Sequence, residues 1–193
     1  MANKEELFAT VKKLRIDCAV RQKKGLHFIV ASVLIWFGVL LIHASALPIE
    51  NKNFYTFVCS APLMPLAMMI AKLFHIDFKS KDNPLTELGI MFSVNQMIYL
   101  LIAMWVYAAT PEKFLMVYSM IFGAHLLPYG WLYGSKSYFI LSVLIPIASL
   151  LIGLIFSPVV LAAFMLIEEI GFCLLLTIEN KKLAKKLEAE AYS

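Results

Sequence analysis

Long apolar runs, separated by short polar stretches, divide the chain into six segments. They are Leu26–Ala46, Phe54–Phe74, Leu85–Ala109, Phe114–Tyr133, Tyr138–Phe156 and Val159–Ile178. Each is close to the about 20 residues that a helix needs to cross a hydrocarbon core of roughly 30 Å. The runs are continuously apolar rather than alternating, which disfavours the strands of a membrane barrel. The pattern therefore predicts an all-α fold, a polytopic transmembrane bundle of six helices over residues 26–178.

Composition supports a membrane environment. Hydrophobic residues make up 61% of the chain and charged residues 16%, whereas soluble domains average roughly 45–50% and about 25%. A chain of 193 residues has too little interior to hide that much apolar surface from water. The first apolar run is about 20 residues long, which exceeds the apolar part of a cleavable signal peptide. We therefore expect this run to remain as the first membrane span.

The distribution of positive charge predicts the orientation of the bundle. Of the 17 lysines and arginines, all except Lys52 and Lys113 fall on the side that carries both termini. Because cytoplasmic loops are enriched in lysine and arginine, both termini are predicted to be cytoplasmic, N-in and C-in. Topology thus accounts for the net positive charge, and no nucleic-acid partner is predicted.

The two ends of the chain form separate segments in this reading. Residues 1–25 predict an amphipathic interfacial helix with an apolar stripe of Leu7, Phe8, Val11, Leu14 and Cys18. Such a helix buries its stripe at the headgroup boundary while its cations meet anionic lipid headgroups. A solvated segment that only sets topology is the alternative. Residues 179–193 predict a helical cytoplasmic tail.

Several polar residues are predicted to lie near the bilayer midplane. Glu168 and Glu169 fall near the centre of the last segment, His125 near the centre of the fourth, and Asn95 and Gln96 near the centre of the third. An ionisable group at that depth costs roughly 2.5–3.5 kcal/mol even on mild insertion scales. Three helices that place polar groups in one layer predict a shared internal site.

The paired glutamates are the most specific feature of that layer. Two carboxylates in a low-dielectric environment cannot both ionise comfortably, so we expect at least one to be protonated unless a cation is bound. Glu168 and Glu169 would then form a proton-coupling or cation site, or else a neutral hydrogen bond that holds helices together. His125 and Tyr129 share one helix face. They would act as a proton relay or ligand contact, or would simply pack in the bundle.

Prolines fall inside three of the segments and are predicted to break them. The residues are Pro62, Pro65, Pro128 and Pro146. Each frees a backbone carbonyl one turn upstream, and broken helices often line transporter sites. Kinks without function are the alternative. The six segments also divide into two halves of inverted topology, with the proline breaks expected in the middle helix of each half.

Short motifs in the middle of the chain carry a resemblance to a known family. The motifs NPLTELG, NQMIYL, MVYSMIFGAHLLPYGWLY and SKSY, between Asn83 and Tyr138, resemble a family of small bacterial multi-pass membrane proteins that is a domain of unknown function. The resemblance implies the bacterial inner membrane and supplies no activity. The chain departs from intramembrane proteases with paired glutamates, because Glu168 and Glu169 are followed by IGFCL without an arginine and His125 precedes them.

These observations favour a small proton- or cation-coupled transporter for an unknown small molecule or ion. The glutamates would titrate, and His125, Tyr129, Asn95 and Gln96 would complete the polar lining. A non-catalytic sensor, immunity or assembly protein is the main alternative, and a metal-dependent intramembrane enzyme is less favoured. The three cysteines have no metal-ligand spacing, so no cofactor or metal is predicted. The small size is compatible with a homodimer.

Overall fold

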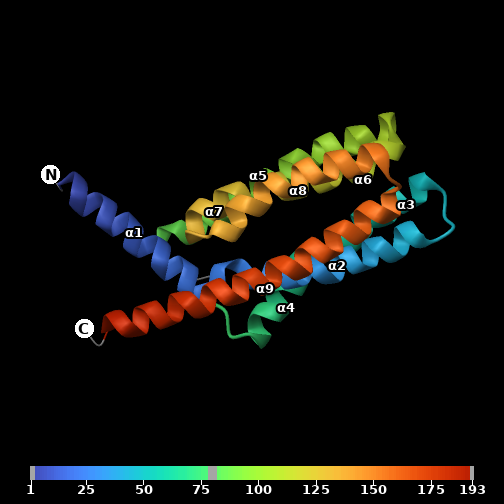
Figure 1. Cartoon of the computed structure of the whole chain (residues 1–193). Coiled ribbons are helices and arrows are strands. Elements are labelled where there is room, and N and C mark those ends of the chain that lie inside the picture. Colours follow the sequence, from blue (N-terminus) through green and yellow to red (C-terminus); the bar gives the residue numbers. More distant parts are fainter. Residues whose placement is uncertain (1–2, 78–81, 192–193) are drawn as a thin grey trace.

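The computed structural model describes residues 3–77 and 82–191. Lys79 and Lys81, which contribute to the predicted orientation, lie outside these ranges. Within the described residues, six helical segments are long and apolar enough to cross a membrane. The prediction of an all-α bundle of six spans is therefore confirmed. Both termini lie at the same end of the molecule (Figure 1), which we call the terminal end.

The elements follow one another with short connections. They are α1 (Lys4–Arg21), the 3₁₀ turn η1 (Lys23–Gly25), α2 (Leu26–Ala44), α3 (Ile49–Ser60), α4 (Leu63–Leu73), α5 (Pro84–Ala109), the 3₁₀ turn η2 (Pro111–Lys113), α6 (Phe114–Ala124), α7 (Leu127–Tyr133), α8 (Lys136–Ile155) and α9 (Pro158–Ala191). The second span therefore consists of α3 and α4, and the fourth of α6 and α7. The last span continues without a break into the predicted tail.

Two of the predicted helix breaks are present, and one proline leaves its helix intact. The second span is interrupted at Ala61 and Pro62, and the fourth at His125 and Leu126, just before Pro128. Pro65 lies in the first turn of α4, where a missing N–H removes no helical hydrogen bond.

Pro146, in contrast, lies inside the continuous helix α8. An added Cβ at Gly123 of α6 would lie 2.6 Å from Pro146 Cδ, so α6 packs directly against this proline. The break in the second half of the chain therefore falls in its first helix rather than in its middle one. This placement corrects the expected symmetry between the halves.

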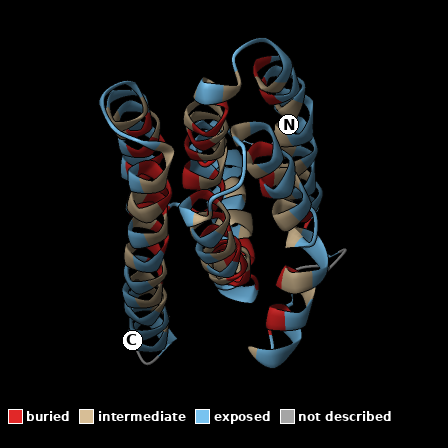
Figure 2. Cartoon of the chain, turned by 90° about the vertical axis from the view of Figure 1, so that its right-hand side faces the viewer, coloured by how far each residue is buried: buried red, intermediate tan, exposed pale blue. Residues whose placement is uncertain are grey.

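The core lies between two closely packed helix pairs. Helix α2 packs along α9, and α6 packs along α8 (Figure 1). Buried residues face the interior between the helices, and the exposed ones form the outer surface (Figure 2). The largest fully buried side chains include Trp36 of α2, Phe114 of α6 and Phe172 of α9. Helix α5 packs mainly on α6 and α7 and exposes most of its length, with Thr86, Ala103 and Val106 buried.

Candidate functional site

A cavity of about 330 Å³ lies beside the two helix breaks. Residues of α2, α5, the α3–α4 break and the α6–α7 break line it, and α8 contributes Tyr138. Its wall is rich in aromatic rings: Phe28, Trp36, Phe57, Tyr118, Phe122, Tyr129, Tyr133 and Tyr138. Most ligand sites combine such apolar walls with a few polar groups, in volumes of roughly 300–1,000 Å³. The cavity has the size and the lining of a small-molecule site.

Tyr129 supplies one of the polar groups and connects α7 to α5. Its hydroxyl lies 2.6 Å from Ser93 Oγ and donates to the carbonyl of Gly89 at 3.0 Å. Ser93 and Gln96 of α5 both line the cavity beside it. The least buried helix of the bundle is thus held to the cavity wall by hydrogen bonds of one tyrosine.

His125 lies at the α6–α7 break and also lines the cavity. Its Nδ1 contacts the carbonyl of Phe122. Because a carbonyl can only accept, Nδ1 carries a proton, and in the neutral ring Nε2 is then an acceptor. The ring packs edge-on against Phe122 and Tyr129, with centroid separations of 5.3 and 6.1 Å. The break therefore places an imidazole in the aromatic wall.

Glu169 of α9 lies behind this wall and is fully buried, with 0% exposure. The hydroxyl of Ser32, on α2, donates to its Oε2. Its Oε1 has no hydrogen-bond partner among the described residues. Ser32 Oγ also lies 2.8 Å from the carbonyl oxygen of Ile29, a second acceptor for its one hydrogen, and Ser32 itself lines the cavity. One serine thus separates the buried carboxyl from the cavity.

The remaining residues of the predicted polar layer lie elsewhere. Neighbours on a helix project about 100° apart, so each adjacent pair is split. Glu169 is buried and Glu168 is half-buried. Gln96 lines the cavity, whereas Asn95 is exposed and donates to Tyr99 Oη at 3.0 Å. The cavity and its border therefore contain Glu169, Gln96, His125 and Tyr129 of the predicted set.

A polar clasp at the terminal end of the cavity was not predicted from the sequence. Lys24 Nζ lies 2.6 Å from Glu179 Oε2, and the Lys24 side chain is 8% exposed. Ser137 donates to Glu179 Oε1 through its amide at 3.0 Å and its hydroxyl at 2.7 Å. Tyr138 Oη donates to the carbonyl of Lys24 at 2.9 Å. These contacts tie η1 to α8 and α9.

The turn held by this clasp has an unusual backbone. Lys23, Lys24 and Gly25 have φ values of +45°, +52° and +71°, and left-handed conformations are unfavourable for residues other than glycine. An added Cβ at Gly25 would lie 3.0 Å from Tyr138 Oη. The turn thereby places backbone directly against the tyrosines of the cavity wall.

Helix α1 docks on the same end through Asn83, which precedes α5. Asn83 Nδ2 donates to the carbonyl of Leu14 at 2.8 Å and to Asp17 Oδ2 at 2.9 Å, while its Oδ1 caps α5 by accepting from Leu85 N at 2.9 Å. The hydrogen bond from Asn83 is the largest effect on Asp17 and lowers its pKa; burial opposes this shift, and Arg21 lowers the pKa further. Nearby, burial raises the pKa of Cys18 to about 11.

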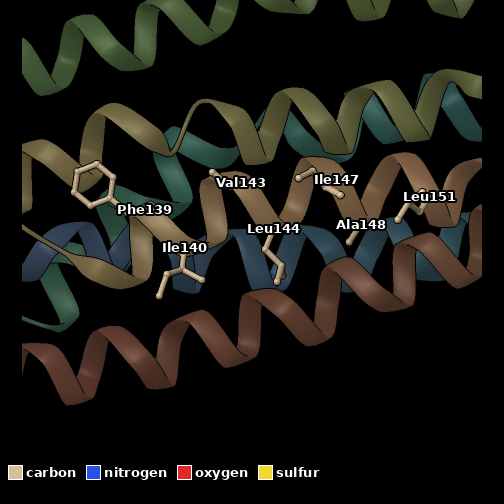
Figure 3. A pocket seen from close by; sticks show the side chains of 7 residues that line it. All are labelled: Phe139, Ile140, Val143, Leu144, Ile147, Ala148 and Leu151. Carbon is tan, nitrogen blue, oxygen red and sulfur yellow. The ribbon is translucent and has the colours of Figure 1, made fainter.

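Outside this cavity, two further features bear on ligand chemistry. Within the described ranges, no three histidine, cysteine, aspartate or glutamate side chains gather as metal ligands. A second hollow lies on α8 and is lined by Phe139, Ile140, Val143, Leu144, Ile147, Ala148 and Leu151 (Figure 3). These side chains are all apolar, as a surface against hydrocarbon requires. The hollow therefore has the character of a lipid-facing surface.

Comparison with known proteins places the chain in a family. The model of a family described as Family of unknown function (DUF7010) matches residues 11–179. The chain belongs to DUF7010. The match spans all six membrane helices and confirms the resemblance to an uncharacterised family seen in the sequence motifs. No curated protein and no solved structure matches the chain. In this DUF7010 member, the cavity and the buried Glu169 behind Ser32 are the features that bear on function.

Proposed function

We propose that this DUF7010 protein is a small proton-coupled permease of the bacterial inner membrane. The cavity is its substrate site and Glu169 is its coupling group. The observation that carries the proposal is the contact between Glu169, fully buried, and Ser32, which lines the cavity. A carboxyl at membrane depth marks ion and proton pathways in many transporters.

The hydroxyl of Ser32 suits a group that gains and loses a proton. It has one hydrogen and two acceptors within reach, Glu169 Oε2 and the carbonyl of Ile29. A protonated Glu169 can donate to Ser32 Oγ while Ser32 donates to Ile29. An ionised Glu169 instead needs the serine hydrogen for itself. Rotation of the Ser32 hydroxyl therefore accommodates both the protonated and the ionised form of Glu169. In either form, Glu169 is hydrogen-bonded to a residue that lines the cavity.

The breaks in the surrounding helices support a mechanism of alternating access. The cavity lies at the breaks α3–α4 and α6–α7, and discontinuous helices commonly form transporter sites. Helix α5, which forms another wall, is held there by Tyr129 and is otherwise largely exposed. Movement of α5 and of the half-helices would open the cavity without disturbing the packed pair α2 and α9.

The membrane setting of the permease follows from charge and exposure. We propose that both termini face the cytoplasm and that the first half of α1 contacts anionic headgroups. Leu7 and Phe8 are 59% and 64% exposed, and Lys12 and Lys13 beside them are also exposed. Apolar side chains flanked by cations bind the surface of anionic bilayers.

The test measures proton flux in proteoliposomes that contain a trapped pH-sensitive dye. Amines, amino acids, sugars and organic acids are added outside, one compound at a time. We expect at least one compound to trigger proton movement with the wild type and with Glu168→Gln, and none with Glu169→Gln. Glu168 is the matched control because it is the adjacent carboxyl and is only half-buried. The proposal fails if no compound triggers flux, or if Glu169→Gln retains it.

A further inference from the structure

We propose that the ligand of the cavity is a lipophilic organic cation that enters from the bilayer. The inference rests on the proposed function in one respect, that the cavity is the ligand site. Three observations point to this chemical class: the aromatic wall, the distribution of charge around it, and an opening toward the lipid.

The aromatic wall suits a cation with apolar substituents. Rings from five elements line the cavity, among them Trp36 of α2, Phe57 of α3 and Tyr118 of α6. The faces of such rings attract cations, indole most strongly, and the attraction is greatest where water is excluded. The same rings offer apolar contact to the substituents of an organic ion. Small inorganic ions, which have no apolar substituents, would not use so much aromatic surface.

The charge around the cavity favours a positive ligand over a negative one. No lysine or arginine is among the described residues that line it. Lys24, next to the lining residue Gly25, is paired with Glu179. The buried acid Glu169 lies behind Ser32, and its Oε1 has no partner among the described residues. A cation near Ser32 would be attracted to the ionised carboxyl of Glu169.

The cavity also reaches the outer surface of the bundle. Met64 of α4 and Met97 of α5 both line it and are 47% and 56% exposed. Ala61, at the α3–α4 break, lines it and is exposed as well. Helices α4 and α5 form facing parts of the wall without packing closely on each other. The mouth between them opens at membrane depth, where a lipid-dissolved cation is available and a sugar is not. Flexible methionine side chains can adapt to the entering molecule.

Two probes of the same shape and opposite charge test the ligand class. Tetraphenylphosphonium is a cation with four phenyl rings, and tetraphenylborate is its anionic counterpart. Equilibrium binding of each is measured to the full-length protein in nanodiscs, with binding to empty nanodiscs subtracted. We expect saturable binding of the cation and none of the anion.

Matched variants assign the binding to the cavity. Trp36→Phe keeps a ring but weakens its attraction for cations, so we expect affinity for tetraphenylphosphonium to fall about fivefold. Trp105→Phe is the control, because Trp105 is 67% exposed on α5 and does not line the cavity. If Trp36→Phe does not fold, Phe57→Leu takes its place with the same expectation.

Three results would overturn the ligand class: saturable binding of tetraphenylborate, no saturable binding of tetraphenylphosphonium, or equal binding by the cavity variant and Trp105→Phe. Each would leave the proton-flux test of Glu169 unaffected. Conversely, if the expected proton flux is not seen but tetraphenylphosphonium still binds, the permease proposal is rejected and the cation site is retained.

Discussion

Ser32 of α2 donates a hydrogen bond to Glu169 of α9, across the most closely packed helix pair of the bundle. The serine also lines the aromatic cavity, whereas the carboxyl is fully buried. The pair therefore belongs both to the core that holds the spans together and to the site where a ligand would bind. A purely structural glutamate would need the first relationship but not the second.

Removing the serine hydroxyl should destabilise the protein. Ser32→Ala leaves Glu169 without its described hydrogen-bond donor, and an unsatisfied buried polar group costs about 1–3 kcal/mol. Ser149→Ala is the control, since Ser149 is also buried but its hydroxyl donates to a weak acceptor, Met165 Sδ, at 3.6 Å. The free energy of unfolding is measured by denaturant titration in detergent. Equal decreases in unfolding free energy for the two variants would show that the contact between Ser32 and Glu169 makes no specific contribution to stability.

The clasp at the terminal end should be worth more than a surface ion pair. Lys24→Met would leave Glu179 partly buried without its cation. Loss of one partner of a fully buried pair costs about 3–5 kcal/mol, and the 19% exposure of Glu179 reduces the expected cost toward the lower end of that range. Lys186→Met interrupts an exposed pair with Glu190, 3.7 Å apart, and should cost below about 1 kcal/mol. Similar unfolding free energies for both variants would contradict a buried clasp.

Asn83 should control the docking of α1, with Cys18 as the reporter. Cys18 is 1% exposed, and its raised pKa of about 11 makes it slow to react with thiol reagents while α1 is docked. Asn83→Ala removes the two hydrogen bonds from Asn83 to α1, each worth about 1 kcal/mol, and should raise the labelling rate of Cys18 roughly tenfold or more. The background carries Ala at Cys59 and Cys173.

Asn95→Ala is the control for this experiment, because Asn95 is an exposed asparagine of α5, the helix that Asn83 precedes. Its labelling rate should equal that of the background protein. Docking through Asn83 would be contradicted if the two alanine variants labelled alike.

Acid should also release α1. The pKa of Asp17 is lowered by the hydrogen bond from Asn83 and by Arg21. A carboxyl whose pKa is lowered on folding stabilises the docked state above its ordinary pKa, and this contribution is lost as the pH falls through the lowered value. Spin labels on cysteines introduced at Thr10 and Lys182 should therefore move apart in strong acid. Asp17→Asn should remove this pH dependence, and a transition that persists in the variant would assign it to other groups.

The membrane spans could be predicted because lipid imposes them. Every backbone polar group must be satisfied within a helix, so length and apolarity suffice to locate the six spans. The effect of a proline depends on its neighbours, which a sequence does not show. Pro128 lies beside a break, whereas Pro146, against Gly123, lies in a continuous helix.

The candidate site was predictable only in outline. Depth along the chain indicated Glu169, His125 and Gln96, but depth cannot tell which of two adjacent residues faces inward. Because neighbouring residues of a helix point in different directions, Glu169 is buried and Glu168 is half-buried. The aromatic lining of the cavity was not predicted, because an aromatic residue in a membrane segment is usually interpreted as a contact with lipid. Lys24 and Glu179 are 155 residues apart, and nothing in their spacing marks them as partners.

Infrared spectroscopy of the reconstituted protein tests the central claim most directly. The C=O stretch of a protonated carboxylic acid is separate from the bands of carboxylates. We expect such a band at neutral pH in the wild type and in Glu168→Gln, its absence in Glu169→Gln, and a change in its intensity when a ligand enters the cavity. A band that is unchanged in Glu169→Gln, or one that never responds to pH or ligand, would contradict a role for Glu169 in proton coupling.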